Sequence, residues 1–209
     1  VIFSWRIPEA EVTSHSTDSL SVKQILKQPG VLAFFIACLL MAFAHGPYYT
    51  FYSIYLVEYG YSKGTIGWLW AVGVICEIGI FFLIPRLMNW FSLKQVLAFS
   101  FCCAVIRFLM IGWGVEWPAV ILLAQVLHAA TYGAHHVAAM MVIHHFFRGR
   151  HQAKGQTFYT SFTFGIGGAL GGVFSGYAWE WMGPEFTFSI SALAAFLGLG
   201  LIIWKVNIK

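Results

Sequence analysis

The sequence predicts an all-α membrane protein with six transmembrane helices, and three observations lead to this prediction. The chain is 59% hydrophobic and only 10% charged, whereas a soluble domain carries about 25% charged residues. Six apolar runs each approach the ~20 residues that a helix needs to cross a bilayer. Turn residues and charges separate these runs. A soluble globular fold is therefore excluded, and membrane lipid surrounds the expected bundle.

The residues before the first apolar run predict a different kind of segment. Residues 1–29 are expected to form a cytoplasmic linker, because the stretch from residue 4 onward is rich in Ser, Thr and Glu. Its last part, SVKQILKQ, predicts a short amphipathic helix on the membrane surface. The chain begins with a short apolar stretch and no Met, so we expect a fragment of a longer protein. Residues 30–209 then form the six-helix bundle.

The first three predicted helices have Pro and charged residues at or near their boundaries. The helix at residues 30–56 contains Pro47, which lacks a backbone N–H, so we expect a kink or break about two-thirds of the way across. The helix at residues 66–85 ends at the Pro85-Arg86 pair. The third helix covers residues 94–113 and ends before a Trp-Pro pair.

The last three predicted helices are bounded by Pro, Gly and basic residues. The helix at residues 118–143 begins with a proline and is the most polar of the six. The helix at residues 157–178 contains a stripe of glycines four residues apart, which predicts close approach of a neighbouring helix. The stripe consists of Gly168, Gly172 and Gly176. A Gly-Pro pair precedes the last helix, at residues 186–204.

Basic residues divide unevenly between the two sides of this predicted bundle. If the N-terminus is cytoplasmic, the outer side holds one basic residue, Lys63, and the acidic residues Glu58, Glu116, Glu180 and Glu185. The inner side holds Arg6, Lys23, Lys27, Arg86, Lys94, Arg148, Arg150, Lys154, Lys205 and Lys209. Cytoplasmic loops are enriched in Lys and Arg, so both termini are expected in the cytoplasm. The basic residues form no single patch, and no nucleic-acid partner is expected.

Three ionisable residues, Glu77, Arg107 and His128, each interrupt a different apolar run. A charge at membrane depth costs roughly 2.5–3.5 kcal/mol, so it is usually functional or paired. At 1.5 Å of rise per residue, their depths fall within about 8 Å of one another. We therefore expect a Glu–Arg–His network near mid-membrane that takes part in substrate binding or proton coupling. The alternative is a static ion pair that locks the helices together.

Polar and aromatic residues on the first and fourth helices predict a substrate cavity between them. Broken helices often line transport sites, and three- and four-residue spacing places several of these residues on one helix face. The cavity candidates are His45, Tyr48, Tyr49, Tyr52, Gln125, Thr131, Tyr132 and His136. Histidine titrates near neutral pH, which suits a proton relay. Simple packing is the alternative for this set, and it is the favoured interpretation for His135.

Other functional classes have little support in the sequence. A metal site would need a carboxylate or cysteine at ligand spacing beside the histidines, and none is found. A haem carrier would need histidine pairs on two helices, whereas one helix holds most of them. A membrane enzyme would need a nucleophile with a base, but there is no G-x-S-x-G motif, and neither Ser161 nor Ser175 has a partner at matching depth. We expect neither an enzyme, a bound metal nor a cofactor.

Four stretches resemble the C-terminal half of the 3-phenylpropionate permease family, a branch of the major facilitator superfamily related to lactose permease. They read HGPYYTFYSIYLVEYGYS, IGWLWAVGVICEIGIFF, AVIRFLMIG and QVLHAATYGAHHVAAM. The resemblance covers residues 22–205. It implies one half of a twelve-helix secondary transporter in a plasma membrane, such as a bacterial inner membrane. The N-terminal six-helix half of the same transporter is then the partner.

The resemblance also implies a function. It implies proton-coupled symport of a small organic solute, with an aromatic carboxylate such as 3-phenylpropionate first and a sugar or nucleoside as the alternative. Glu77, Arg107 and His128 match charged positions in the family's motifs, and His136 matches its second histidine. Lactose permease has an essential Glu three residues after its histidine, where this chain has Thr131. Glu77 is then the carboxylate on which proton coupling depends.

Overall fold

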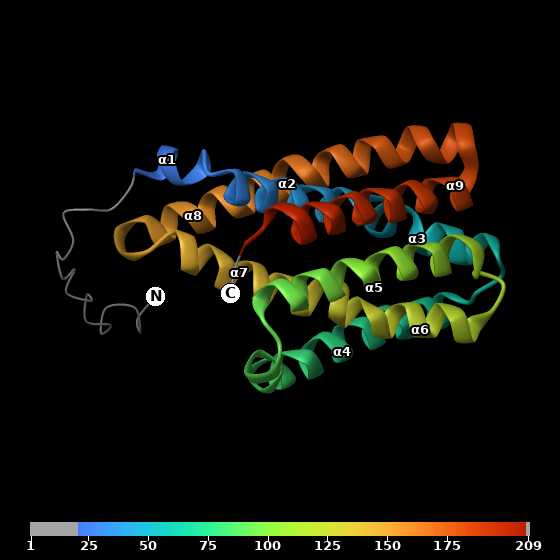
Figure 1. The fold of residues 1–209 in the computed structure, drawn as a ribbon. Coiled ribbons are helices and arrows are strands. Elements are labelled where there is room, and N and C mark those ends of the chain that lie inside the picture. The colour runs from blue at the N-terminus through green and yellow to red at the C-terminus, as the bar shows by residue number, and fades with distance from the viewer. Residues whose placement is uncertain (1–20, 208–209) are drawn as a thin grey trace, which may run out of the picture.

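A computed structural model describes residues 21–207, and all regular structure in this range is helical. The long helices lie side by side along one direction, so the chain passes up and down through a bundle (Figure 1). Five helical stretches in the described range are long and apolar enough to cross a membrane. The last of them folds back on itself, which gives six passes.

The first pass consists of two helices that meet at a histidine. The short helix α1 (Val22–Leu26) precedes α2 (Pro29–Ala44), and α3 (Gly46–Glu58) follows after an interruption at His45. The interruption lies two residues before Pro47 because proline is best accommodated in the first turn of a helix. The helix α1 occupies the place expected for the amphipathic segment, and its position on a membrane surface stays a prediction. The linker expected from residue 1 onward lies largely outside the described residues.

The second and third passes are α4 (Lys63–Trp90) and α5 (Leu93–Trp113). The helix α4 continues through Pro85, where the sequence suggested an end. One proline removes one backbone hydrogen bond, and the chain turns only where Ser92 caps the next helix. That cap is a complete capping box with Gln95. The helix boundary is therefore set by the cap and not by the proline.

The fourth pass changes its helical type in the middle of the membrane. It comprises α6 (Pro118–His128), the π-helical segment η2 (Ala129–Ala134) and α7 (His135–Phe146). A short 3₁₀ turn, η3 (Gly149–His151), leads to the next pass. A π-helical segment carries an extra residue per turn and is found mostly at functional sites. It turns the side chains after it relative to those before it.

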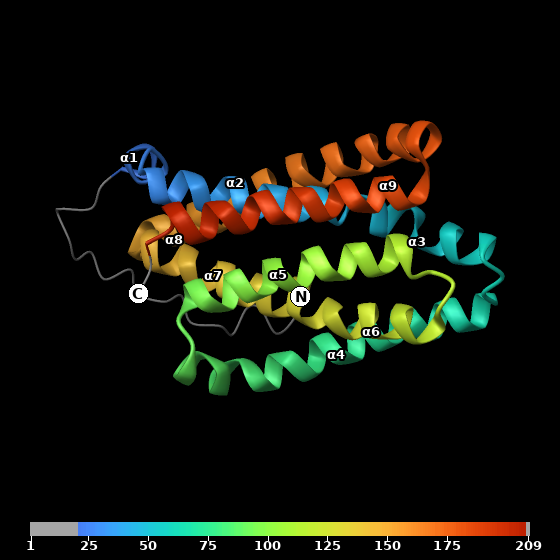
Figure 2. The ribbon, with the colours of Figure 1, turned by 45° about the vertical axis from the view of Figure 1, so that its right-hand side comes forward.

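The last two passes form a helical hairpin. They comprise α8 (Gln152–Tyr159), the π-helical segment η4 (Thr160–Gly167) and α9 (Gly168–Lys205). Gly183 has φ 82° and ψ 172°, a conformation that glycine adopts without strain. The chain reverses there, and the two arms of α9 lie side by side in both views (Figure 1 and Figure 2). A straight helix of this length would be about twice as long as a bilayer is thick.

Close contact between α2 and α9 depends on glycines other than those expected. A Cβ atom on Gly171 would collide with the backbone of Phe43, and one on Gly167 would lie 2.7 Å from the carbonyl oxygen of Leu39. The predicted stripe of Gly168, Gly172 and Gly176 meets nothing within 4 Å. The expectation that this stripe forms the helix contact is wrong, because the neighbouring stripe with the same spacing faces α2.

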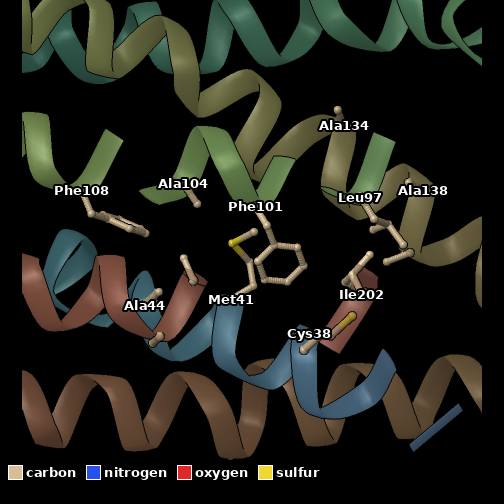
Figure 3. Close-up of a cluster of buried hydrophobic side chains, with 14 of the residues drawn as sticks. Cys38, Met41, Ala44, Leu97, Phe101, Ala104, Phe108, Ala134, Ala138 and Ile202 are labelled. Atoms are coloured by element: carbon tan, nitrogen blue, oxygen red, sulfur yellow. The ribbon is translucent and has the colours of Figure 1, made fainter. Parts of the chain in front are cut away.

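The core of the bundle lies between α2, α5, α7 and α9. Phe101 of α5 points toward Cys38 and Met41 of α2 and toward Ile202 of α9 (Figure 3). A Cβ atom on Gly198 of α9 would touch the Phe101 ring, so this glycine makes room for it. Outside the core, large apolar side chains are exposed on every pass, as expected for a surface that faces lipid.

Candidate functional site

A Glu–His pair, which is an ion pair only when the histidine is protonated, joins the second and fourth passes. The Nε2 atom of His128, at the end of α6, lies 2.6 Å from Oε1 of Glu77 in α4. The two side chains are 6% and 15% exposed. When the Glu77 carboxylate is ionised it only accepts, so Nε2 carries the hydrogen of this bond, and Nδ1, which has no hydrogen-bond partner among residues 21–207, is the position that takes up a further proton. The pair can therefore hold one proton or two.

A glycine in η2 allows α4 to come this close. A Cβ atom on Gly133 would lie 2.7 Å from Cγ2 of Ile80 and 3.6 Å from Cγ of Glu77. Any larger residue would push α4 away from the fourth pass. The pair is thus positioned by close packing of Ile80 and Glu77 against Gly133.

Arg107 of α5 is completely buried, yet it has no carboxylate partner at ion-pair distance within residues 21–207. Its Nε atom donates to the carbonyl oxygen of Ala124 at 2.9 Å. Its guanidinium carbon lies 4.1 Å from the centre of the Tyr48 ring and 5.4 Å from that of Phe108. Such aromatic faces stabilise a cation. The Nη2 atom has no hydrogen-bond partner in the described part of the chain.

His45 connects Arg107 to the break between α2 and α3. Its Nδ1 atom lies 2.8 Å from the carbonyl oxygen of Met41, and Nη1 of Arg107 lies 3.3 Å from its Nε2 atom. A carbonyl oxygen only accepts and a guanidinium only donates, so Nδ1 carries the hydrogen and Nε2 accepts. These two bonds define a neutral His45. The interruption of the first pass thus places a histidine acceptor against the buried arginine.

The three charged residues expected to form one network are arranged in two parts. Glu77 and His128 form a direct ion pair, whereas Arg107 bonds to His45 and to a backbone carbonyl. Ring contacts connect the two parts, because the His128 ring lies 6.0 Å from the His45 ring and 5.3 Å from the Tyr48 ring. All of these groups come together from the first four passes.

Three of the predicted cavity residues lie behind this cluster and not at a cavity. Tyr48 and Tyr52 are fully buried, and the Tyr48 hydroxyl donates to Oε1 of Gln125 at 2.9 Å. The Tyr48 ring also lies 4.7 Å from the Trp70 ring. This layer supports the arginine from behind. The predicted role of Tyr48, Tyr52 and Gln125 in lining a cavity therefore does not agree with their positions, since hydrogen bonding and ring packing enclose them.

The other five cavity candidates line a real cavity of about 220 Å³. They are His45, Tyr49, Thr131, Tyr132 and His136. The cavity lies between the first, fourth and fifth passes, and both π-helical segments contribute to its wall. Its lining is mostly apolar and aromatic, which suits an organic ligand with few polar groups.

A column of stacked rings runs from the ion pair along the cavity wall. The His128 and Tyr132 rings lie 5.5 Å apart at 20°, and the Tyr132 and His136 rings lie 6.5 Å apart at 11°. Beyond them, the Tyr159 hydroxyl lies 3.4 Å from Nδ1 of His136. The first three residues recur every four positions, as helix geometry predicts. The column provides groups that could pass a proton away from Glu77.

The cavity wall also contains polar and aromatic residues that were not among the sequence candidates, including His135, Tyr159, Thr163 and Phe164. His135 shares the helix face of His128, Tyr132 and His136, but the favoured interpretation was that it bonds backbone or neighbouring hydroxyls within the bundle. The structure places both His135 and His136 in the cavity wall. The signal in the fifth pass is weaker, since Thr and Phe are common in apolar helices.

Comparison with known proteins identifies the family. The sequence model of the MFS_1 like family matches residues 4–190. The chain belongs to this family. This membership, together with the helical passes, confirms the predicted fold class of an all-α membrane protein of the major facilitator superfamily, and it confirms the resemblance noted from the sequence.

Two curated members are similar to this chain, both from Escherichia coli (strain K12). One, named "Probable 3-phenylpropionic acid transporter", is 34% identical over 162 residues, which cover 77% of this chain and 42% of that protein. The other, named "Putative nucleoside transporter YegT", is 30% identical over 123 residues, covering 57% of this chain and 28% of that protein. No solved structure matches. The chain thus matches less than half the length of these relatives, and their names agree with the expectation of a non-enzyme.

Proposed function

We propose that this chain is the C-terminal half of a secondary transporter that carries a small organic solute together with protons. The first substrate class is an aromatic carboxylate such as 3-phenylpropionate, in line with the name of the relative that is 34% identical. The basic residues of its short loops support an orientation with both termini in the cytoplasm, in a bacterial inner membrane.

The observation that carries the proposal is the buried charge of Arg107 without a carboxylate partner in the described part of the chain. A charge this deep is costly unless an opposite charge reaches it. Guanidinium groups often bind carboxylates in a bidentate geometry, with two parallel N–H···O bonds. The Nη2 atom of Arg107 has no hydrogen-bond partner in residues 21–207. A substrate carboxylate that bonds here would complete the arginine's bonding.

The charges of the site give a reason for coupling to protons. Arg107 contributes one positive charge, Glu77 contributes one negative charge, and His45 and His128 are neutral in the arrangement described above. A bound carboxylate makes this sum negative, and one further proton on the Glu77–His128 pair restores neutrality. Net charge is strongly disfavoured in a low-dielectric interior. One carboxylate and one proton are therefore expected to bind together.

The aromatic part of the substrate has a matching place in the cavity. Tyr49, Tyr132 and Phe164 present rings to it, and His45 lies between the cavity and Arg107. A volume of about 220 Å³ is below the ~300–1,000 Å³ of usual ligand sites. The second wall of the pathway then comes from the N-terminal half, and rocking of the two halves gives alternating access.

A nucleoside is the second candidate substrate, because the other similar relative carries the name of a nucleoside transporter. A nucleoside is neutral and would leave Arg107 without an anionic partner. The two candidates therefore differ in the role of the arginine. A sugar is the third candidate substrate, and its uptake is compared in the same experiment.

Uptake into vesicles with an imposed pH gradient tests the proposal in the complete transporter, with both halves present. Labelled 3-phenylpropionate, uridine and lactose are compared. We expect pH-driven uptake of the aromatic acid, and we expect Glu77→Gln and His128→Ala to abolish its response to the gradient. Gln has nearly the same shape as Glu but cannot exchange the proton.

The matched control is Glu116→Gln, which neutralises an exposed carboxylate in the loop between α5 and α6. This variant is expected to keep the pH response. Unchanged pH-driven uptake in both Glu77→Gln and His128→Ala would contradict proton coupling through this pair. Uptake of uridine and not of the acid would instead favour the nucleoside alternative.

A further inference from the structure

Two polar side chains at the inner end of the cavity have no hydrogen-bond partner in the described part of the chain. They are His135, through both ring nitrogens, and Thr163, through its hydroxyl. Their exposed fractions are 5% and 2%. Buried polar groups in proteins are almost always paired, so two such residues in one cavity wall need an explanation.

Other buried polar groups of the same wall are satisfied by the protein itself. His45 uses both ring nitrogens, and the hydroxyl of Thr131 donates to the carbonyl oxygen of His128. Thr50 similarly donates to the carbonyl oxygen of Gly46. Among the described residues that line the cavity, the buried polar atoms without a partner are therefore those of His135 on α7 and Thr163 on η4.

The distance between the two ends of the cavity fits one small aromatic molecule. His135 follows His128 by seven residues, which is about two helical turns or roughly 10 Å. Between these levels the wall is aromatic, with the Tyr132 and Phe164 rings 6.4 Å apart. The cavity thus has one end at His45, which bonds to Arg107 behind it, an aromatic middle, and an end at His135 and Thr163.

We propose that His135 and Thr163 bind a hydroxyl group on the substrate ring, so that the preferred substrates are hydroxylated aromatic carboxylates. This inference rests on the proposed transport of an aromatic carboxylate, and it names the subclass. A ring hydroxyl both donates and accepts one hydrogen bond. A neutral imidazole and a threonine hydroxyl together offer the complementary donor and acceptor.

Uptake by the complete transporter tests this inference with 3-phenylpropionate, the unsubstituted acid, and with its 3-hydroxyphenyl and 4-hydroxyphenyl analogues. We expect at least one hydroxylated acid to show a KM about tenfold lower than the unsubstituted acid does, as one well-formed hydrogen bond in a buried site permits. His135→Phe and Thr163→Val are each expected to reduce this preference to about twofold or less. The readout is the ratio of the two KM values within each variant, which separates loss of the hydroxyl contact from a general change in binding.

The variants are chosen to keep shape. Phe can occupy the place of the His135 ring, which packs edge-to-face on Phe101 with centroids 5.3 Å apart. Thr187→Val is the control for Thr163→Val, because Thr187 is buried outside the cavity and its hydroxyl donates to the carbonyl oxygen of Gly183. The control should keep the preference. His135→Gln, which retains a donor and an acceptor, should keep part of it.

Ligand-induced thermal stabilisation in detergent provides a second readout that does not require transport. The hydroxylated acid should raise the Tm of wild type more than the unsubstituted acid does, and His135→Phe should remove that difference. Equal KM and Tm effects of the acids in wild type would overturn the inference while leaving aromatic carboxylate transport intact. Uptake of none of the acids would overturn the proposed function, and this inference with it.

Discussion

Arg107 contacts neutral groups, whereas the sequence suggested that it pairs with Glu77. The backbone carbonyl of Ala124, the nitrogen of His45 and the face of Tyr48 each take part of its charge. None of them carries a negative charge, so Arg107 has no ionic partner within residues 21–207. The carboxylate of Glu77 is meanwhile engaged by His128. In the proposed mechanism, this separation assigns proton binding and anion binding to different atoms of one cluster.

Replacement of Arg107 by Lys tests the anion-binding role. Lys keeps the charge, but it cannot bond to Ala124 and His45 while presenting two further N–H groups to a carboxylate. We expect Arg107→Lys to raise the KM for the aromatic acid by about tenfold or more, equivalent to roughly 1.4 kcal/mol. The KM is measured from initial uptake rates in vesicles. Arg86→Lys, at an exposed position of α4, is the control, and an equal KM in both variants would contradict the role.

At the scale of helices, hydrophobicity and loop charge predicted the number and order of the passes but not their internal details. An apolar run of about twenty residues has few alternatives to a membrane-spanning helix. The π-helical segments η2 and η4 have no comparable signal, because one extra residue per turn leaves composition unchanged. The sequence therefore offers five candidates that line the cavity, whereas the lining residues of η4, such as Thr163 and Phe164, have no distinguishing signal in an apolar helix.

The glycines of the fifth pass show a second limit of sequence reasoning. Two stripes with four-residue spacing run along this helix, one through Gly167 and Gly171 and the other through Gly168, Gly172 and Gly176. Spacing alone cannot say which stripe meets a neighbour. Only the position of α2 decides it, and that position results from the packing of the whole bundle.

The difference between the two stripes leads to a prediction about stability. Gly171→Ala places a methyl group against the backbone of Phe43, so α2 and α9 must separate, and we expect a loss of about 1–3 kcal/mol of unfolding free energy. Gly176→Ala meets nothing within 4 Å and should be neutral or gain up to about 1 kcal/mol from helix propensity. Thermal unfolding in detergent compares the two. A Tm for Gly171→Ala at or above that of Gly176→Ala would refute the close contact.

At the scale of the whole molecule, the bundle has a small cavity and one poorly covered helix. The cavity is bounded by three passes and remains small for a ligand site. The helix α4, which carries Glu77, has only 17% of its apolar window buried within the chain, compared with 44–61% for the other passes. The curated relatives are more than twice as long as the part that this chain matches. These facts support a second half that completes the pathway.

The dependence on a second half is testable by separate expression. We expect these 209 residues to insert into the membrane as a folded bundle, because their core between α2, α5, α7 and α9 is complete. Alone they should show no pH-driven uptake of an aromatic acid, since a pathway between two halves cannot form from one. Co-expression with the N-terminal half as a separate chain should restore uptake.

Glu77→Gln in the co-expressed pair is the control that separates assembly from coupling. The two halves should still co-purify, while the pH response is lost. Uptake by this chain alone, at the rate of the co-expressed pair, would show that the bundle is a transporter by itself.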